Sequence, residues 1–233
     1  MSFSDRALME LHVEALYRST TEGRLLETRE GDPVRAPRFF LGRTGQGNLW
    51  RFRDDLPASL VRGLDALAAA EPVLPELPRE PVSLSQFRKL LQEHEEIQHA
   101  WVGPAYSFPE ELSAPPQVVR ITDENSQLLG EEFAWLRTER AACEPAVALV
   151  IDEHAVSVGF SSRVTARAAE AGVNTLEAFR GHGHASRVVA AWAIAVREMG
   201  QVPLYSTSWG NLASQGVARR LGLWLFGVDL SLR

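Results

Sequence analysis

The chain has 233 residues, of which 45% are hydrophobic and 23% charged, with a formal net charge of −6. These values are typical of a globular protein with one large or two small domains. No apolar run approaches the roughly 20 residues of a membrane helix, and the first residues lack a signal-peptide pattern. The single cysteine, Cys143, excludes an internal disulfide and a cysteine-rich zinc site. We therefore expect a soluble, cytoplasmic protein without membrane association.

Charge is unevenly distributed along the chain. Seven arginines and four acidic residues lie between Arg167 and Arg233, so this third is basic within an acidic protein. The overall negative charge disfavours general nucleic-acid binding. A locally basic third fits a small polyanionic ligand better than DNA, although a chance fluctuation in composition would give the same pattern.

In the first half, hydrophobic periodicity and turn residues predict three helices and one hairpin. The helices are expected at 5–18, 57–70 and 83–97, and the hairpin at 38–54. Prolines spaced along 72–81 predict a stiff, extended connector, and a second proline-rich stretch runs from 104 to 116.

In the second half, strands and helices alternate. We expect strands at 118–122, 146–151, 155–161, 167–176, 203–209 and 223–230, and helices at 125–140, 182–199 and 211–221. This order predicts an α/β or α+β domain built on a mixed sheet.

A glycine-rich segment joins the strand at 167–176 to the long helix that follows it. Its sequence is Arg180-Gly181-His182-Gly183-His184-Ala185. The N-terminus of a helix presents unpaired N–H groups and a partial positive charge, which together favour a phosphate oxygen. The glycines allow the backbone to approach an anion closely, and Arg180 adds a positive charge.

Two familiar nucleotide-binding motifs do not fit this segment. A Walker-type loop would end in Gly-Lys-Ser/Thr, which is absent, and Ser186 stands where the dinucleotide-binding motif requires its third glycine. The segment therefore indicates an anion site of another kind.

The pattern Arg180-x-x-Gly183-x-Ala185 resembles the Q/R-x-x-G-x-G/A motif of the GNAT N-acetyltransferase superfamily. A second segment, with Asn211, Ser214 and Leu221-Gly222-Leu223, is similar to the family's N-x-x-A/S…L-G-F/L segment. The two occur in the expected order. The resemblance, which covers roughly 118–230, implies a GNAT-like, mostly antiparallel mixed sheet flanked by helices, with an additional N-terminal α/β region.

The resemblance also implies a direct transfer from acetyl-CoA, as cosubstrate, to an amine. Pantetheine would lie between the diverging strands at 167–176 and 203–209, and a backbone N–H near Leu176 would polarise the thioester carbonyl. The residues implied in cofactor binding are Val173, Thr175, Leu176, Arg180, Gly181, His182, Gly183, His184, Ala185, Ser186, Asn211 and Ser214.

Amine attack requires a neutral amine, so a general base is expected. Glu170 is the first candidate, because it resembles the position on this strand where some members of the family place their base; the alternatives are a surface carboxylate and a carboxylate paired with Arg167. Many members use a tyrosine seven residues after the asparagine as general acid, but that position is Ala218 here. Tyr205 and Ser214 are weak candidates to replace it.

Two further features, a pair of histidines and the single cysteine, could indicate metal binding or nucleophilic catalysis, but the sequence around them does not support either. His182 and His184 have the spacing of metal ligands, but no third ligand is visible nearby, so we expect no metal. Cys143 has no neighbouring pattern that would make it a nucleophile, and we expect it to be buried.

The sequence therefore predicts an acetyl-CoA-dependent N-acetyltransferase domain at 110–233, acting on a small-molecule or peptide amine. The alternative is a non-catalytic GNAT-like protein that binds or senses an acyl-CoA. Residues 1–109 match no motif and are expected to be a degenerate GNAT-like fold, an acceptor-side region or a dimerisation element. The acceptor and the choice between monomer and homodimer stay open.

Overall fold

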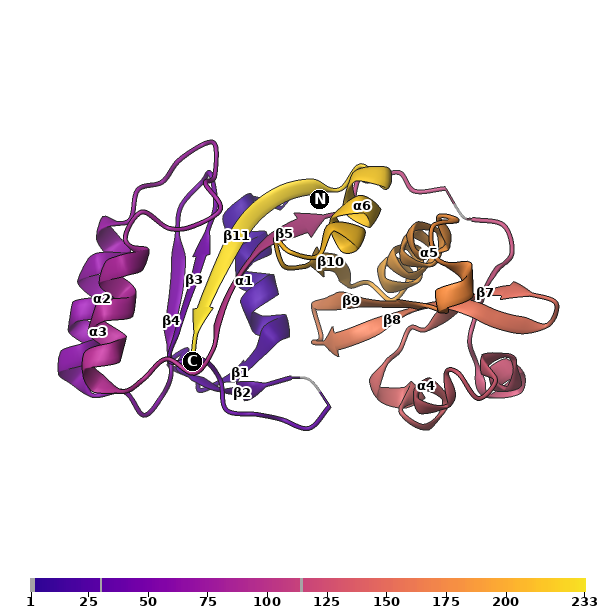
Figure 1. Cartoon of the computed structure of the whole chain (residues 1–233), viewed down its shortest axis with the longest axis horizontal. Helices are drawn as coiled ribbons and strands as arrows, with labels where there is room; N and C mark the ends of the chain where they lie inside the picture. The colour runs from indigo at the N-terminus through magenta and orange to yellow at the C-terminus, as the bar shows by residue number, and fades with distance from the viewer. Residues whose placement is uncertain (1–2, 30, 114) are drawn as a thin grey trace. The chain divides into compact units, whose positions relative to one another are not determined.

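The computed structural model of the chain describes residues 3–29, 31–113 and 115–233. The chain forms two compact units (Figure 1). Unit 1 comprises Met1–Tyr106, Ser206–Leu212 and Leu225–Arg233, and unit 2 comprises Ser107–Tyr205 and Ala213–Trp224. The chain therefore leaves unit 1 twice, first to build most of unit 2 and then to add 213–224 to it, and each time it returns to unit 1.

The described residues of unit 1 contribute four neighbouring strands of the large sheet, a separate two-stranded sheet and three α-helices. The four strands follow the order β4-β3-β11-β5, and β1 pairs with β2. The helices are α1 (Asp5–Leu16), α2 (Ala58–Ala70) and α3 (Leu84–His94). The strands are β1 (Tyr17–Ser19), β2 (Leu25–Thr28), β3 (Phe39–Arg43), β4 (Leu49–Phe52), β5 (Ala100–Ser107) and β11 (Trp224–Leu232).

Side chains alternate across β3 and divide the core of unit 1 into two layers. Phe39 and Leu41 pack with α2 and α3, whereas Phe40 and Gly42 face α1. A Cβ on Gly42 would overlap the Met9 side chain of α1, so glycine allows that helix to approach the sheet closely.

Two buried arginines fasten the helical layer and the proline-rich segment of unit 1. Arg38 donates to the carbonyls of Leu91, Glu95 and Glu96 at the end of α3, at 2.9–3.0 Å. Arg43 donates in the same way to three consecutive carbonyls at 78–80. Each guanidinium thus donates to three backbone carbonyls; of the three that Arg38 contacts, the Leu91 carbonyl also accepts from the Glu95 N–H at the end of α3.

Unit 2 is a sheet with helices on both faces. Its strands follow the order β10-β9-β8-β7-β6. They are β6 (Val118–Arg120), β7 (Val147–Ile151), β8 (His154–Val164), β9 (Ala168–Thr175) and β10 (Val202–Ser206). The helices are η1 (Asp123–Leu129), α4 (Ala134–Thr138), η2 (Arg140–Ala142), η3 (Glu177–Phe179), α5 (His184–Glu198) and α6 (Leu212–Arg220).

One face of this sheet packs against α5 and the other against η1 and α4. A Cβ on Gly159 would lie 2.9 Å from the Val188 carbonyl oxygen, which shows how closely α5 approaches β8. Trp192 of α5 donates its indole N–H to Ser161 on the same face. On the opposite face, Phe160 contacts Trp135. Both pack against a buried hydrophobic cluster to which η1 and α4 contribute side chains.

The predicted mixed, mostly antiparallel sheet flanked by helices is confirmed. The prediction of one helix over 125–140 is wrong: η1, α4 and η2 replace it, because Gly130 interrupts the chain with a φ of +60°. Strand β5 and the β1–β2 hairpin were not predicted. No helix among the described residues is long and apolar enough to cross a membrane.

Candidate functional site

Strands β9 and β10 run parallel and pair only at their beginnings. The paired residues are Val202 with Ala168, Pro203 with Ala169, and Leu204 with Glu170. Beyond Glu170, β9 continues to Thr175 and remains paired with β8. The second half of β9 therefore has a hydrogen-bonding neighbour on one side and has diverged from β10 on the other.

Hydrogen bonds at both ends of β9 show which backbone groups face the diverging side. The Val202 N–H donates to the Arg167 carbonyl, and the Leu176 N–H donates to the Val156 carbonyl on β8. Since backbone groups alternate in direction along a strand, the N–H groups of Val173 and Thr175 point away from β8. The Leu176 N–H is already bonded to β8. A carbonyl-polarising N–H near Leu176 would therefore be that of Val173 or Thr175.

The glycine-rich segment forms a tight loop before α5. Gly181 and Gly183 have φ values of +81° and +79°, a conformation that costs other residues about 1–2 kcal/mol. Gly183 is the N-cap residue of α5 and has no side-chain capping group, so the first-turn N–H groups are open to an external acceptor. The Ser186 hydroxyl turns back and donates to the Gly183 carbonyl.

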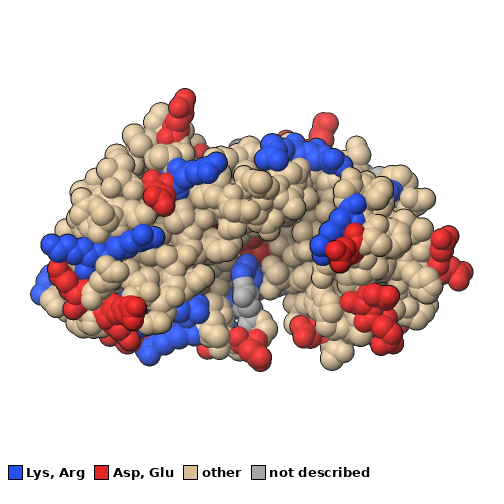
Figure 2. All heavy atoms as spheres, in the orientation of Figure 1, with Lys and Arg blue, Asp and Glu red and all other residues tan. Residues whose placement is uncertain are grey.

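Two arginines approach this loop from different elements. Arg180 donates from Nε to the Thr175 carbonyl at 3.2 Å, on the side of β9 that faces away from β8. Arg220, the last residue of α6, lies over Gly183: a Cβ there would overlap Nη1 and lie 3.6 Å from Cζ. Figure 2 shows basic side chains over α6. Sequence reasoning missed Arg220, whose only sequence signal is the Arg219-Arg220 pair ending α6.

The two histidines of the loop stack on each other, with ring centroids 5.8 Å apart. Burial lowers the pKa of His184 below its ordinary value, and His182 and Arg187 lower it further by charge repulsion. His184 Nδ1 is buried and has no hydrogen-bond partner among the described residues. Within those residues, no group of three potential metal ligands occurs.

Glu170 is a core residue of β9, with 1% of its surface exposed. It is therefore not the solvated surface carboxylate that the sequence left as an alternative. Gly159 faces α5 and pairs with Val173, so the odd-numbered residues of β9 face that helix. The side chain of Glu170 accordingly lies on the face opposite α5.

The two weak general-acid candidates are bonded to each other. The hydroxyls of Tyr205 and Ser214 lie 2.6 Å apart, and Tyr205 is 2% exposed. This bond ties β10 to α6, with Phe108 packed edge-on against the tyrosine ring. Ala218, where the family has its tyrosine, is buried.

The structure brings together Val173, Thr175, Arg180 and the loop from Gly181 to Ser186, all within unit 2. Asn211 lies immediately before α6, where its N–H donates to the Ser208 carbonyl, and it belongs to unit 1. Its expected role toward a cofactor stays a prediction.

No protein-family model and no curated protein matches the chain. Among solved structures, a GCN5-related N-acetyltransferase from Kribbella flavida is 17% identical, with a TM-score of 0.51 over 100% of this chain and 95% of that one. A GCN5-related N-acetyltransferase-like protein from Streptococcus suis 89/1591 is 17% identical over 97% and 99%, with a TM-score of 0.47. An acetyltransferase of the GNAT family from Colwellia psychrerythraea is 13% identical over 79% and 75%, with a TM-score of 0.49.

The chain therefore has the fold of the GNAT N-acetyltransferases, and the predicted resemblance is confirmed at the level of the fold. The alignment with the Kribbella protein also spans the first 109 residues, where the sequence shows no motif of its own.

Proposed function

We propose that this protein is an acyltransferase that moves the acetyl group of acetyl-CoA to a primary amine. The observation that carries the proposal is that one continuous segment of the chain presents two sets of N–H groups, one on strand β9 and one at the N-terminus of α5. The N–H groups of Val173 and Thr175 face the diverging side of β9, and a few residues later the glycine loop opens the first turn of α5.

The loop has the properties of a pyrophosphate site. Gly181 and Gly183 carry no side chains and adopt positive φ, so the backbone of the loop can turn tightly and approach an anion. Arg180 and Arg220 supply positive charge from two sides, in addition to the partial charge of the helix N-terminus. His182, His184 and Ala185 are the other residues of this proposed cradle.

The N–H groups of Val173 and Thr175 would pair with pantetheine and polarise the thioester carbonyl. An amine nitrogen forms a bond to the acetyl carbon while the carbon–sulfur bond breaks. The nitrogen loses a proton and the departing thiolate gains one, so the products are an amide and free coenzyme A. Holding both reactants together supplies much of the rate, and oriented N–H groups stabilise the negative charge that develops on oxygen.

Glu170 is proposed as the general base. It is buried on β9, three residues before Val173, and so about 10 Å along the strand from the nearer of the two proposed oxyanion donors. A water chain would connect its carboxylate to the amine. Glu170→Gln should leave the affinity for coenzyme A unchanged and lower kcat about a hundredfold.

A non-catalytic acyl-CoA sensor is the second candidate. It is favoured by Ala218, which carries no hydroxyl, and by the hydrogen bond between Tyr205 and Ser214, the two hydroxyls that were the candidates to replace the missing acid. The same loop and strand would then bind the cofactor without a transfer step.

Two measurements test the proposal. Titration calorimetry with coenzyme A asks whether the loop binds it, and release of free thiol from acetyl-CoA with a panel of amines asks whether transfer occurs. Binding with amine-dependent thiol release supports the enzyme. Binding without thiol release from any amine selects the sensor. Absence of coenzyme A binding would overturn both.

A further inference from the structure

Unit 2 contains a cavity of about 660 Å³ on the face of the sheet that η1 and α4 cover. Its lining comes from the segment 127–137, from the turn between β7 and β8, and from the residues that follow β9. Leu176 and Phe179 contribute to the lining and also connect β9 to the glycine loop. The cavity is therefore built onto the chain segment that the proposed function uses.

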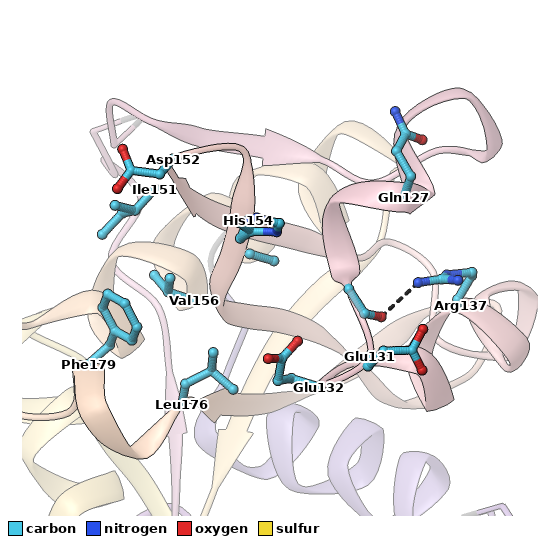
Figure 3. Close-up of a pocket in the computed structure, with 12 residues that line it drawn as sticks. Gln127, Glu131, Glu132, Arg137, Ile151, Asp152, His154, Val156, Leu176 and Phe179 are labelled. Atoms are coloured by element: carbon cyan, nitrogen blue, oxygen red, sulfur yellow. Dashed lines mark hydrogen bonds between the residues drawn. The ribbon is translucent and has the colours of Figure 1, made fainter.

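The cavity combines an apolar wall with an acidic rim. Val156, Leu176 and Phe179 lie together on one side, as Figure 3 shows. Three acidic residues line it, Glu131, Glu132 and Asp152, against one arginine and one histidine, Arg137 and His154. In Figure 2, acidic side chains gather over α4 and over the turn between β7 and β8. Such a surface favours a ligand with an apolar body and a positive charge.

The single arginine does not neutralise this rim. Arg137 donates from Nη2 to the Gly130 carbonyl at 2.7 Å, so its guanidinium is fastened to the backbone at the outer side of the cavity (Figure 3). The Glu132 carboxylate folds back over Gly130, where a Cβ would lie 2.8 Å from its Oε2. In Figure 3 this carboxylate points toward the space beside Leu176.

We propose that this cavity binds an amphipathic primary amine as its ammonium ion. The ammonium group pairs with Glu132, with Asp152 adding negative charge at the rim, and the hydrocarbon body lies against Val156, Leu176 and Phe179. That this amine is the acceptor of the acetyl group rests on the proposed function. The binding of the amine itself does not.

The test uses n-alkylamines from propylamine to hexylamine as probes, with n-hexanol as the uncharged control, and calorimetry on the full chain without coenzyme A. Burial of each methylene against the apolar wall should tighten binding about fourfold until the cavity is filled. Hexanol should bind at least about fivefold more weakly than hexylamine, because it lacks the charge.

Variants locate the site. Glu132→Gln should weaken hexylamine binding about three- to fivefold and leave hexanol binding unchanged. Glu153→Gln is the matched control, because Glu153 is an exposed acid of the neighbouring turn that does not line the cavity. Equal affinities for hexylamine and hexanol, no dependence on chain length, or equal effects of the two substitutions would each overturn the proposal.

Coenzyme A binding separates this result from the proposed function. If the amines bind as described and coenzyme A does not bind, the cavity is an ammonium site but the proposed transfer reaction is wrong. If coenzyme A binds and no amine does, the proposed cofactor loop is supported but this cavity is not the acceptor site.

Discussion

Arg220 reaches Gly183 from the end of another helix, so that the guanidinium occupies the space next to the hydrogen that glycine carries in place of a side chain. The positive φ of Gly183 favours glycine at this position, and a Cβ there would force the end of the Arg220 side chain to move. The contact with Arg220 is not visible from the motif alone. The contact also means that the loop and α6 together determine the charge around the α5 N-terminus.

Gly183→Ala should weaken coenzyme A binding about tenfold, because the methyl group displaces Arg220 from the loop. Gly200 is the control, since it has a φ of +77° and open space around its missing Cβ. Gly200→Ala should lower the free energy of unfolding by about 1 kcal/mol, the same amount as expected for Gly183→Ala, without changing the affinity for coenzyme A.

Gly181→Ala tests the reason for the effect, because a Cβ on Gly181, like one on Gly200, would meet no other atom. If Gly181→Ala weakens coenzyme A binding as much as Gly183→Ala, the contact with Arg220 does not explain the effect.

Arg180→Gln and Arg220→Gln should each raise the dissociation constant for coenzyme A about tenfold, because each removes a charge-assisted contact to phosphate. The salt dependence of binding should also become shallower. The exposed Arg88 of α3 provides the control, and Arg88→Gln should change neither quantity. Calorimetry at several salt concentrations measures both quantities. An unaltered salt dependence in Arg180→Gln and Arg220→Gln would contradict the proposal that these arginines contact the pyrophosphate.

Tyr205→Phe should lower the free energy of unfolding by about 1 kcal/mol through loss of the bond to Ser214. Ser214→Ala should cost a similar amount, and the double variant should cost less than the sum, which a urea-denaturation cycle would show. A kcat about a hundredfold lower in Tyr205→Phe, with no such loss in Ser214→Ala, would assign the proton donor to the tyrosine instead.

His184 should make the stability of the protein depend on pH. Its folded-state pKa lies below the ordinary value of 6.5, first because of burial and then because of His182 and Arg187. The unfolded chain therefore binds more protons, and the contribution to stability is present above about pH 6.5 and lost as the pH falls toward the folded-state pKa. His184→Gln should reduce the loss between about pH 7.5 and pH 5.5, whereas replacing the exposed His94 should not. Urea denaturation at the two pH values provides the measurement.

Arg38→Met should destabilise unit 1 by about 3 kcal/mol, because it removes three hydrogen bonds at the end of α3, including those that the guanidinium donates to the carbonyls of Glu95 and Glu96. Arg88→Met, on the exposed face of α3, should change the free energy of unfolding by less than about 0.5 kcal/mol. A small effect of Arg38→Met in denaturant unfolding would mean that water replaces the guanidinium at these carbonyls.

The sequence was sufficient to predict α5 and the loop before it. The apolar positions of α5 repeat with helical spacing, and the glycines and Arg180 precede it directly. The conformation of Gly181 and Gly183 follows from local chemistry, which a motif can carry. Arg220 could not be predicted in the same way, because its place over Gly183 depends on how α6 packs.

The missed strand β5 shows why local patterns fail where tertiary contacts decide. It contains Gly103 and Pro104, which normally argue against a strand. Here a Cβ on Gly103 would collide with the Thr207 carbonyl oxygen, and the Pro104 carbonyl accepts from the Thr207 N–H at 3.2 Å. In the segment 125–140, Leu129, Phe133 and Leu136 have helical spacing and are buried, but Gly130 breaks the predicted helix after Leu129.

The position of β11 between β3 and β5 has a consequence for how the polypeptide becomes folded during synthesis. Strands β3 and β5 emerge from the ribosome early, yet the strand that joins them is made only after all of unit 2. Their hydrogen-bonding edges and the apolar surface that Leu230 and Leu232 will cover stay open throughout that interval. Expressing residues 1–109 alone would make this state permanent, and such a fragment should aggregate.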